Sequence, residues 1–243
     1  MNIAIIPARG GSQRIPRKNI GSFLGNPAIA ITVKKALDSG LFTQVYVSTD
    51  DDEIADTAIK AGALVPFRRT ADLSDNYTST KEVIRDFIVR QAIEDFLVTC
   101  LYPVTPLLDY RHIHEAEILI SQTKAPFVFP VVEIKVSEAR MFRINSDKKV
   151  ILKNQKDILR RTQDQETSYC DAGQFYLGKA ETWLSDTPII GPESRVTILP
   201  PYEVLDIDTE ADWKFAEEIF RLRNPGFETS DTIHPTNEIT RIK

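Results

Sequence analysis

Short apolar runs alternate with amphipathic stretches along most of the chain. The first run, Ile3–Ile6, is apolar at every position, which is typical of a strand that is covered on both faces. The next stretch repeats apolar residues at helical spacing up to Gly40, with Asn26 as the expected N-cap and Pro27 as the expected first helical residue. This alternation predicts an α/β fold, in which βαβ units form a mostly parallel sheet flanked by helices.

The same pattern continues toward the middle of the chain. We expect further strands at Gln44–Ser48, Leu64–Phe67, Phe96–Leu101 and Phe127–Val132. We expect helices from Asp51 or Asp52 to Gly62, from Ser79 to Ala92, and from Asp109 to Ser121. Near the end of the chain, the pattern predicts a last strand at Glu203–Ile207 and a helix from Thr209 to about Leu222.

The pattern changes between about residues 130 and 178. Three strand-like pieces, Ala139–Ile144, Val150–Leu152 and Gln174–Leu177, are joined by polar connections with no helical periodicity. We interpret this part as an antiparallel excursion laid over the sheet, of a kind that serves for dimer contact or as a lid.

Length and composition fit one large globular domain. A chain of 243 residues can form a substantial core, and 42% hydrophobic with 27% charged residues excludes a disordered or fibrous chain. Hydrophobic periodicity stops after Gly226. We therefore expect one domain over residues 1–224 and a loose tail over residues 225–243.

Charge and cysteine content narrow the class of protein. A net charge of −5 argues against a nucleic-acid partner, which usually requires a basic face. The apolar run at the N-terminus is too short for a signal peptide or a membrane span. Cys100 and Cys170 form no disulfide framework, which favours a reducing, cytoplasmic location without a membrane partner.

The first strand runs into a cationic, glycine-containing loop at residues 7–19. Its sequence is Pro-Ala-Arg-Gly-Gly-Ser-Gln-Arg-Ile-Pro-Arg-Lys-Asn. Glycines let backbone N–H groups approach an anion, and guanidinium groups match phosphate oxygens. The spacing is neither that of a Walker loop nor G-x-G-x-x-G. A solvated cationic surface would also explain these residue types, but the position after a strand favours a ligand site.

Two carboxylates near the end of the chain are candidates for a metal site. Asp206 and Asp208 are two apart on the predicted last strand, so they would share one face and converge on one cation. Mg²⁺, with Mn²⁺ as the alternative, accepts one or two carboxylates together with phosphate oxygens and water. Alternatively, Thr209-Glu210-Ala211-Asp212 resembles a capping box, with Asp208 or Thr209 at the start of a helix. Both roles can coexist.

The loop closely resembles the signature A-R-G-G-S-K-R-I-P-x-K-N of the acylneuraminate cytidylyltransferase family, whose members activate acidic nine-carbon sugars. The resemblance covers about residues 2–222 and includes the Asp-Ile-Asp-Thr sequence at Asp206. It implies a Rossmann-like nucleotide-diphospho-sugar transferase fold, CTP and an acidic nine-carbon sugar as substrates, and a homodimer. The loop departs from the signature at one position, where this chain has Gln13 and the family usually has Lys.

The resemblance also implies roles for individual residues. Arg9 and Lys18 would stabilise developing charge in catalysis, and Asp206 and Asp208 would hold the metal. The implied nucleotide-binding residues are Ala8, Arg9, Gly10, Gly11, Ser12, Gln13, Arg14, Lys18 and Asn19 in the loop, and Arg69, Thr78 and Ser79 further along the chain.

Two segments indicate which sugar is the substrate and which residues bind it. Tyr102 begins Tyr-Pro-Val-Thr-Pro, which stands in place of the family's Q-P-T-S-P. Residues 171–176, Asp-Ala-Gly-Gln-Phe-Tyr, are preceded by Arg-Thr-Gln-Asp and look like the branch that activates pseudaminic acid; sialic acid-specific members carry R-x-N-G-A-x-Y. The sugar-binding residues that the resemblance implies are Tyr102, Arg161, Gln163, Asp171 and Gln174.

The resulting hypothesis is attack of the sugar's anomeric hydroxyl on the α-phosphorus of CTP, with departure of pyrophosphate. Sialic acid and legionaminic acid stay open as alternative sugars. A glycosyltransferase could use Asp206-x-Asp208 to hold an existing nucleotide sugar, and a non-catalytic nucleotide-binding module would find its support in Gln13 alone. His112, His114 and His234 are interpreted as surface residues, so no general base is assigned.

Overall fold

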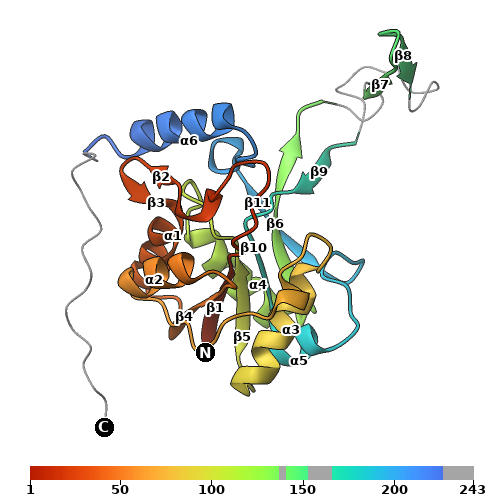
Figure 1. The fold of residues 1–243 in the computed structure, drawn as a ribbon. Coiled ribbons are helices and arrows are strands. Elements are labelled where there is room, and N and C mark those ends of the chain that lie inside the picture. Colours follow the sequence, from red (N-terminus) through yellow and green to blue (C-terminus); the bar gives the residue numbers. More distant parts are fainter. Residues whose placement is uncertain (137–140, 153–165, 227–243) are drawn as a thin grey trace.

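The computed structural model describes residues 1–136, 141–152 and 166–226. Its centre is a seven-stranded sheet in the order β11-β6-β10-β5-β1-β4, with β9 paired to β6 (Figure 1). The strands are β1 Asn2–Pro7, β4 Gln44–Ser48, β5 Leu97–Leu101, β6 Phe127–Ile134, β9 Ser168–Asp171, β10 Phe175–Lys179 and β11 Arg195–Leu199. Along the main path all strands run in one direction except β10, which lies antiparallel between β5 and β6. The predicted α/β class with a mostly parallel sheet is therefore confirmed.

Helices cover both faces of this sheet. They are α1 Ala28–Asp38, α2 Asp52–Lys60, α3 Thr80–Gln91, α4 Arg111–Thr123, α5 Ala180–Leu184 and α6 Glu210–Arg223, with short 3-10 helices η1 Lys18–Ile20, η2 Ala71–Leu73 and η5 Pro201–Glu203. Ala4 and Ile6 of β1 belong to the core beneath α1, α2 and α4, and Ile3 and Ile5 belong to the core beneath α3 and α5. The continuous apolar run at Ile3–Ile6 thus reflects burial on both faces, as expected.

A third apolar cluster connects the end of the chain to its beginning. Phe23 of the β2–β3 hairpin (Ser22–Phe23 and Asn26–Pro27) packs edge-on against Trp213 and Phe220 of α6, with ring centroids 5.8 and 5.6 Å apart. Ile207 is 2% exposed in the same cluster. This packing brings the segment before α6 next to the loop that follows β1.

Several sequence predictions need correction. Residues Leu64–Phe67 form no strand: Leu64 makes one isolated bridge with Tyr46, and Arg68, just beyond this range, makes another with Thr49. Glu203 ends η5, and residues 204–208 lie in no helix or strand. The alternating apolar positions there arise from packing of a loop in the third cluster, a pattern that mimics a half-buried strand. The sequence reading also missed β11 and α5.

The helix boundaries depend on capping side chains. Asp51 caps α2 by accepting a hydrogen bond from the Ile54 N–H, which decides between the two predicted caps. Ser79 forms a capping box with Glu82 at the start of α3. Asn26 is not a cap, because it pairs within the β2–β3 hairpin and Pro27 is the N-cap of α1.

Part of the region between residues 130 and 178 leaves the main body. The second half of β6 pairs with β9 from Val131–Asp171 to Ile134–Ser168, and its last two residues, Glu133 and Ile134, pair with no other strand in the described ranges. The antiparallel hairpin of β7 (Phe142–Ile144) and β8 (Val150–Leu152) lies away from the sheet in Figure 1, not over it as expected. The strand expected at Gln174–Leu177 is β10 of the main sheet, while residues 137–140 and 153–165 lie outside the described ranges.

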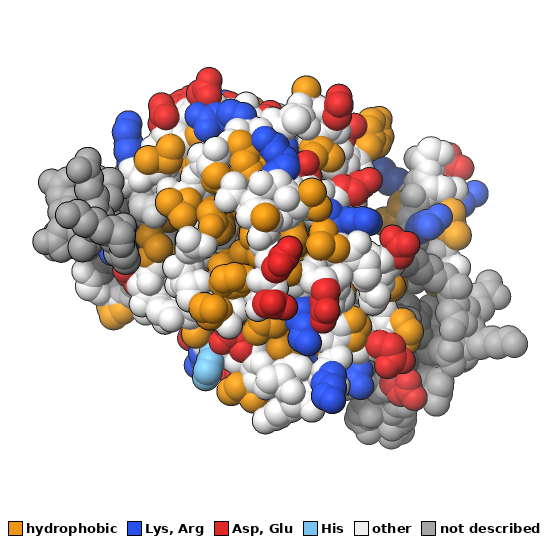
Figure 2. Space-filling model, turned by 90° about the horizontal axis from the view of Figure 1, so that it is seen from below, with side chains coloured by type: hydrophobic (Ala, Val, Ile, Leu, Met, Phe, Trp, Pro, Cys, Tyr) orange, Lys and Arg blue, Asp and Glu red, His pale blue; other side chains and the backbone are white. Residues whose placement is uncertain are grey.

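The amino and carboxyl ends of the parallel strands lie on opposite faces of the molecule. The face near the amino ends of the parallel strands carries apolar side chains mixed with charged groups of both signs (Figure 2). The cationic loop after β1 lies on the opposite face, at the carboxyl ends of these strands.

Within the described ranges, every helix is too short or too polar to span a bilayer. Of the tail expected over residues 225–243, residues 227–243 fall outside the part of the chain that the structure describes.

Candidate active site

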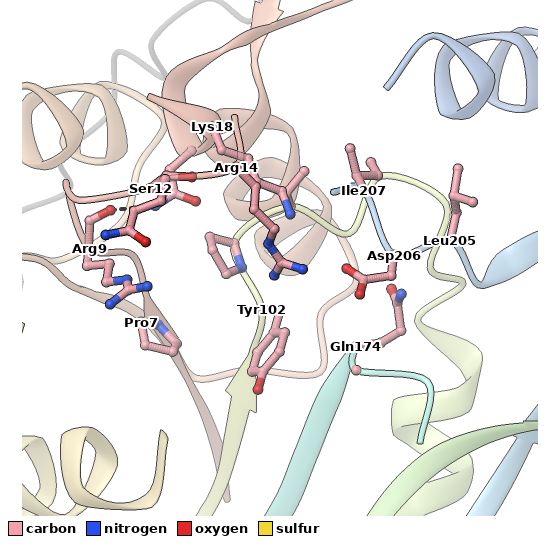
Figure 3. A pocket seen from close by; sticks show the side chains of 15 residues that line it. Pro7, Arg9, Ser12, Arg14, Lys18, Tyr102, Gln174, Leu205, Asp206 and Ile207 are labelled. Atoms are coloured by element: carbon pink, nitrogen blue, oxygen red, sulfur yellow. Dashed lines mark hydrogen bonds between the residues drawn. The ribbon is translucent and has the colours of Figure 1, made fainter. Parts of the chain in front are cut away.

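A cavity of about 400 Å³ opens where β1 and β5 end (Figure 3). Side chains from four separate segments surround it, namely the loop after β1, the turn after β5, the turn before β10 and the segment before α6. The sequence-predicted residues in its wall are Arg9, Ser12, Gln13, Arg14, Lys18, Asn19, Tyr102, Gln174 and Asp206. The cationic loop and the late carboxylate segment, which lie at opposite ends of the sequence, therefore meet in one site.

Specific contacts hold the loop against the start of α2. The Gly10 N–H donates to Asp50 Oδ1 at 3.0 Å, and a Cβ at Gly10 would lie only 2.8 Å from Asp51 Oδ2, so a larger residue would displace the loop. Asn19 is buried, and its side-chain amide donates to the Arg9 carbonyl at 2.9 Å. Asn19 therefore acts on the conformation of the loop as well as lining the cavity.

The loop cations fall into two groups. Arg17, whose backbone is left-handed with φ of 57°, pairs with the α2 N-cap Asp51 and with Glu53 and is absent from the cavity wall. This pairing lowers the pKa of Asp51. Arg14 and Lys18 instead face the late carboxylates. Arg17 thus fixes the loop, while Arg14 and Lys18 remain available to an anion in the cavity.

The late carboxylates form a charged cluster with these two cations. Arg14 hydrogen-bonds to Asp208, and Lys18 Nζ lies 3.8 Å from Asp208 Oδ1. Burial, and then repulsion from Asp208, raise the pKa of Asp206. Burial lowers the pKa of Lys18, although the two carboxylates oppose that shift. The Asp208 carboxylate is therefore close enough to Asp206 to disfavour the charged form of Asp206.

The two carboxylates converge without the predicted strand. They flank the buried Ile207 in an irregular segment, so packing sets their direction. Thr209 caps α6 in a box with Asp212, whose carboxylate also accepts the Asp208 N–H at 3.1 Å. The capping alternative is thus realised by Thr209 and Asp212, which leaves the side chain of Asp208 facing the cations.

The carboxylate pair fits a divalent cation. Asp208 Oδ1 is buried and has no hydrogen-bond partner among the described residues. A cation beside it would satisfy this oxygen and remove the repulsion from Asp206. No group of three or more His, Cys, Asp or Glu side chains suited to a metal occurs within the described ranges. A cation here would complete its coordination with water and substrate phosphate.

A second cavity of about 310 Å³ adjoins the first and shares Pro7, Arg9, Tyr102 and Pro103 with it. Arg69 lines this cavity with its side chain only 4% exposed. Its Nε and Nη2 atoms have no hydrogen-bond partner in the described chain, and Asp50 Oδ1 is 3.9 Å from Nη2. Burial lowers the pKa of Arg69. A buried guanidinium with free donors matches an uncharged or anionic acceptor such as a base carbonyl.

The remaining predicted nucleotide residues differ in their positions. Thr78 lines the second cavity, and its hydroxyl group hydrogen-bonds to Asp75 Oδ1 at 2.7 Å. Ser79 is committed to capping α3, and the Ala8 N–H donates to the Ser48 carbonyl at 2.9 Å. Ala8, Ser79, Gly10 and Gly11 do not contribute to the wall of either cavity.

Of the predicted sugar-binding residues, only some line a cavity. Gln174 is 4% exposed, and its Oε1 has no partner within the described residues; in Figure 3 its amide lies beside Asp206. Tyr102 lies between the two cavities, with its ring edge-on to Tyr176 at 5.7 Å. Asp171 accepts hydrogen bonds from Tyr176 and the Gly173 N–H and does not line either cavity. Arg161 and Gln163 lie outside the described residues.

Sequence reasoning missed three carboxylates and misplaced one histidine. His112 is only 5% exposed, not a surface residue, because it lies between Glu203 and Glu115; His114 is exposed and His234 is outside the described ranges. Asp50, Asp51 and Glu203 were not proposed as site residues. The run Asp50-Asp51-Asp52 directly after β4 was the available signal for the first two, because it follows a strand at the same sheet edge.

Comparison with known proteins connects this geometry to a family. The family model described as Cytidylyltransferase matches residues 3–231. The chain belongs to this cytidylyltransferase family. It is 40% identical to a pseudaminic acid cytidylyltransferase of Campylobacter jejuni over 227 residues, covering 92% of this chain and 97% of that relative. The predicted family and the assignment as a cytidylyltransferase enzyme are therefore confirmed.

A second relative and a solved structure are also similar to this cytidylyltransferase. N-acylneuraminate cytidylyltransferase A of Danio rerio is 34% identical over 216 residues, which is 88% of this chain and 50% of that relative. A solved structure of CMP:2-keto-3-deoxy-manno-octonic acid synthetase complexed with CTP superimposes with a TM-score of 0.69 at 16% identity, covering 91% of this chain and 99% of that chain. At this identity the likeness concerns the fold, and it confirms the expected Rossmann-like nucleotidyltransferase architecture.

Proposed function

We propose that this cytidylyltransferase condenses CTP with pseudaminic acid to give the CMP-sugar and pyrophosphate. The observation that carries the proposal is one cavity lined by Arg14, Lys18 and Asp206, which adjoins the Arg69 cavity. Asp208 does not line the cavity, but it pairs with both of these cations. The triphosphate would lie against the loop, the cytosine against Arg69 and Thr78, and the sugar beside Gln174 and Tyr102.

In this proposal the side chains act by positioning and by charge. Arg9, Arg14 and Lys18 bind phosphate oxygens, and Lys18 with Arg9 stabilises the charge that develops on the leaving pyrophosphate. Asp206 and Asp208 would hold Mg²⁺, or Mn²⁺, which supplies charge neutralisation at the phosphates when bound. The unpartnered Gln174 Oε1 accepts a hydrogen bond from an N–H or O–H group of the sugar.

The choice of sugar rests on two supports. The relative that is 40% identical carries the name pseudaminic acid cytidylyltransferase, and residues 171–176 have the form that we associate with that branch. A pyrophosphate-release assay with CTP and a panel of pseudaminic, sialic, legionaminic and 3-deoxy-octulosonic acids tests the proposal. Pseudaminic acid should give the highest kcat/KM. A higher value with sialic or legionaminic acid would assign the enzyme to that sugar instead.

We also propose a cytoplasmic homodimer. The edge strand β11 exposes Val196 and Ile198, and the β7–β8 hairpin exposes Phe142, Ile144, Val150 and Ile151. Exposed apolar groups on an edge strand of the described sheet, and on a projecting hairpin, favour association with a second copy. Sedimentation velocity on the protein and on Ile198→Asp tests this: the wild type should sediment as a dimer and the variant as a monomer. A monomeric wild type would contradict the proposal.

A further inference from the structure

Glu203 is a buried carboxylate to which the mechanism above assigns no role. It is 1% exposed and lines neither of the two cavities. Its Oε1 accepts hydrogen bonds from Arg111 Nη2 at 3.0 Å and from Arg223 Nη2 at 3.3 Å, and its Oε2 lies 2.8 Å from His112 Nε2. Both oxygens are therefore satisfied within the protein.

The partners of Glu203 come from the start of one helix and the end of another. Arg111 and His112 begin α4, and Arg223 ends α6. Arg223 also donates to the Leu107 carbonyl at 2.5 Å, which joins the turn before α4 to the same network. The second ring nitrogen of His112 lies 2.9 Å from Glu115 Oε2. Glu203 thus connects η5, α4 and α6 at one point.

This point lies three residues before Asp206. Residues 204–208 have no ladder of backbone hydrogen bonds to a neighbouring strand, so their position depends on their two ends and on the packing of Val204, Leu205 and Ile207. The C-terminal end is fixed by the Thr209–Asp212 capping box. The N-terminal end is fixed by η5 and by the buried Glu203 carboxylate.

We propose that Glu203 is a positioning residue that holds Asp206 at the distance from Asp208 that a shared cation requires. This inference rests on the proposed metal-dependent function. Replacing Glu203 by Gln removes the negative charge that Arg111, His112 and Arg223 surround. The N-terminal end of the segment is then released, and the Asp206 carboxylate keeps its charge but loses its fixed position. We expect the cation to bind about tenfold more weakly, which is the lower end of the loss found when groups that orient metal ligands are removed.

The test measures cation binding as well as turnover. For wild type and Glu203→Gln, the dissociation constant of Mn²⁺ in the presence of CTP is determined by electron paramagnetic resonance, well below each Tm. The half-saturating Mg²⁺ concentration in the pyrophosphate assay is determined in parallel. Both should rise about tenfold in the variant, with little change in the affinity for CTP measured without metal. Glu218→Gln, which removes an exposed acidic partner of Arg221 on α6, is the matched control and should change neither value.

A merely structural role predicts a different result. In that case Glu203→Gln lowers Tm but leaves the Mn²⁺ dissociation constant of the folded protein unchanged, and the inference is overturned. Should Glu203→Gln fail to fold, Arg111→Gln replaces it, because Arg111 is 56% exposed at its side chain and its loss removes a single contact to Glu203. A smaller rise in the same dissociation constant supports the inference, and no rise overturns it. An inactive wild type that binds no Mn²⁺ with CTP would instead overturn the proposed function itself.

Discussion

Replacing Arg69 should weaken nucleotide binding without lowering the stability of the fold. Its guanidinium is buried, two of its nitrogens have no hydrogen-bond partner within the described chain, and its nearest carboxylate oxygen is 3.9 Å away on Asp50. In the free protein this arrangement is costly, because a buried charge without full pairing loses its hydration. Arg69→Met preserves much of the side-chain volume while it removes the charge.

The magnitudes follow from this arrangement. Asp50 is 30% exposed at its side chain and already accepts the Gly10 N–H, so losing Arg69 does not leave it buried and unpaired. We expect the free energy of unfolding of Arg69→Met to be unchanged or higher by about 1 kcal/mol. A hydrogen bond from a charged donor contributes about 1.5–3 kcal/mol. Loss of one such bond to the cytosine should therefore weaken CTP binding by about 10-fold to 100-fold.

Urea denaturation and calorimetric titration with CTP measure the two quantities on the same preparations. Arg68→Met is the matched control, because Arg68 precedes Arg69 but pairs with the exposed Asp52. It should leave the CTP dissociation constant unchanged. A destabilised Arg69→Met protein with wild-type affinity for CTP would refute the reasoning, since Arg69 would then be a structural residue and not a nucleotide contact.

Three further predictions concern the cationic loop and the carboxylates. Asp208→Asn should lower kcat in the pyrophosphate assay by about 100-fold or more without a change in far-ultraviolet circular dichroism, whereas Asp186→Asn, at a fully exposed position, should be neutral; comparable activity of the two variants would remove Asp208 from the site. Gln13→Lys should lower the KM for CTP by up to about fivefold, the effect of one exposed charge near an anion, and a higher KM would show that the Gln13 amide has a role of its own. Because the pKa of Asp206 is raised by burial and by Asp208, kcat/KM should fall as the pH drops through this raised value, and more Mg²⁺ should move the fall to lower pH; an acidic limb that is insensitive to Mg²⁺ would contradict this assignment.

The regular part of the fold was predictable because its burial follows simple periodicities. Ile3–Ile6 is apolar at every position and is a central strand, and the helix start expected at Ser79 is confirmed. The strand predicted at Glu203–Ile207 was wrong because a loop that packs alternate residues into a core has the same pattern as a strand. The antiparallel insertion of β10 between β5 and β6 depends on long-range pairing that no local pattern records.

In the candidate site, too, some features could be predicted from the sequence and others could not. The loop at residues 9–19 and the pair Asp206 and Asp208 were predictable, because each is a short motif with a chemical purpose. The contacts that orient them were not, since they join residues far apart in sequence, such as Gly10 with Asp50 and Glu203 with Arg111, His112 and Arg223. Sequence periodicity placed His112 on a helix but could not show that its helix face lies against a buried carboxylate.

The fate of the α-phosphorus of CTP tests nucleotidyl transfer most directly. The enzyme is incubated with pseudaminic acid, Mg²⁺ and CTP labelled at either the α- or the γ-phosphorus. The α-label should appear in a CMP-sugar and the γ-label in pyrophosphate, with equal yields of the two products. Recovery of both labels in unchanged CTP with every sugar of the panel, or product formation only from a preformed nucleotide sugar, would contradict the proposed reaction.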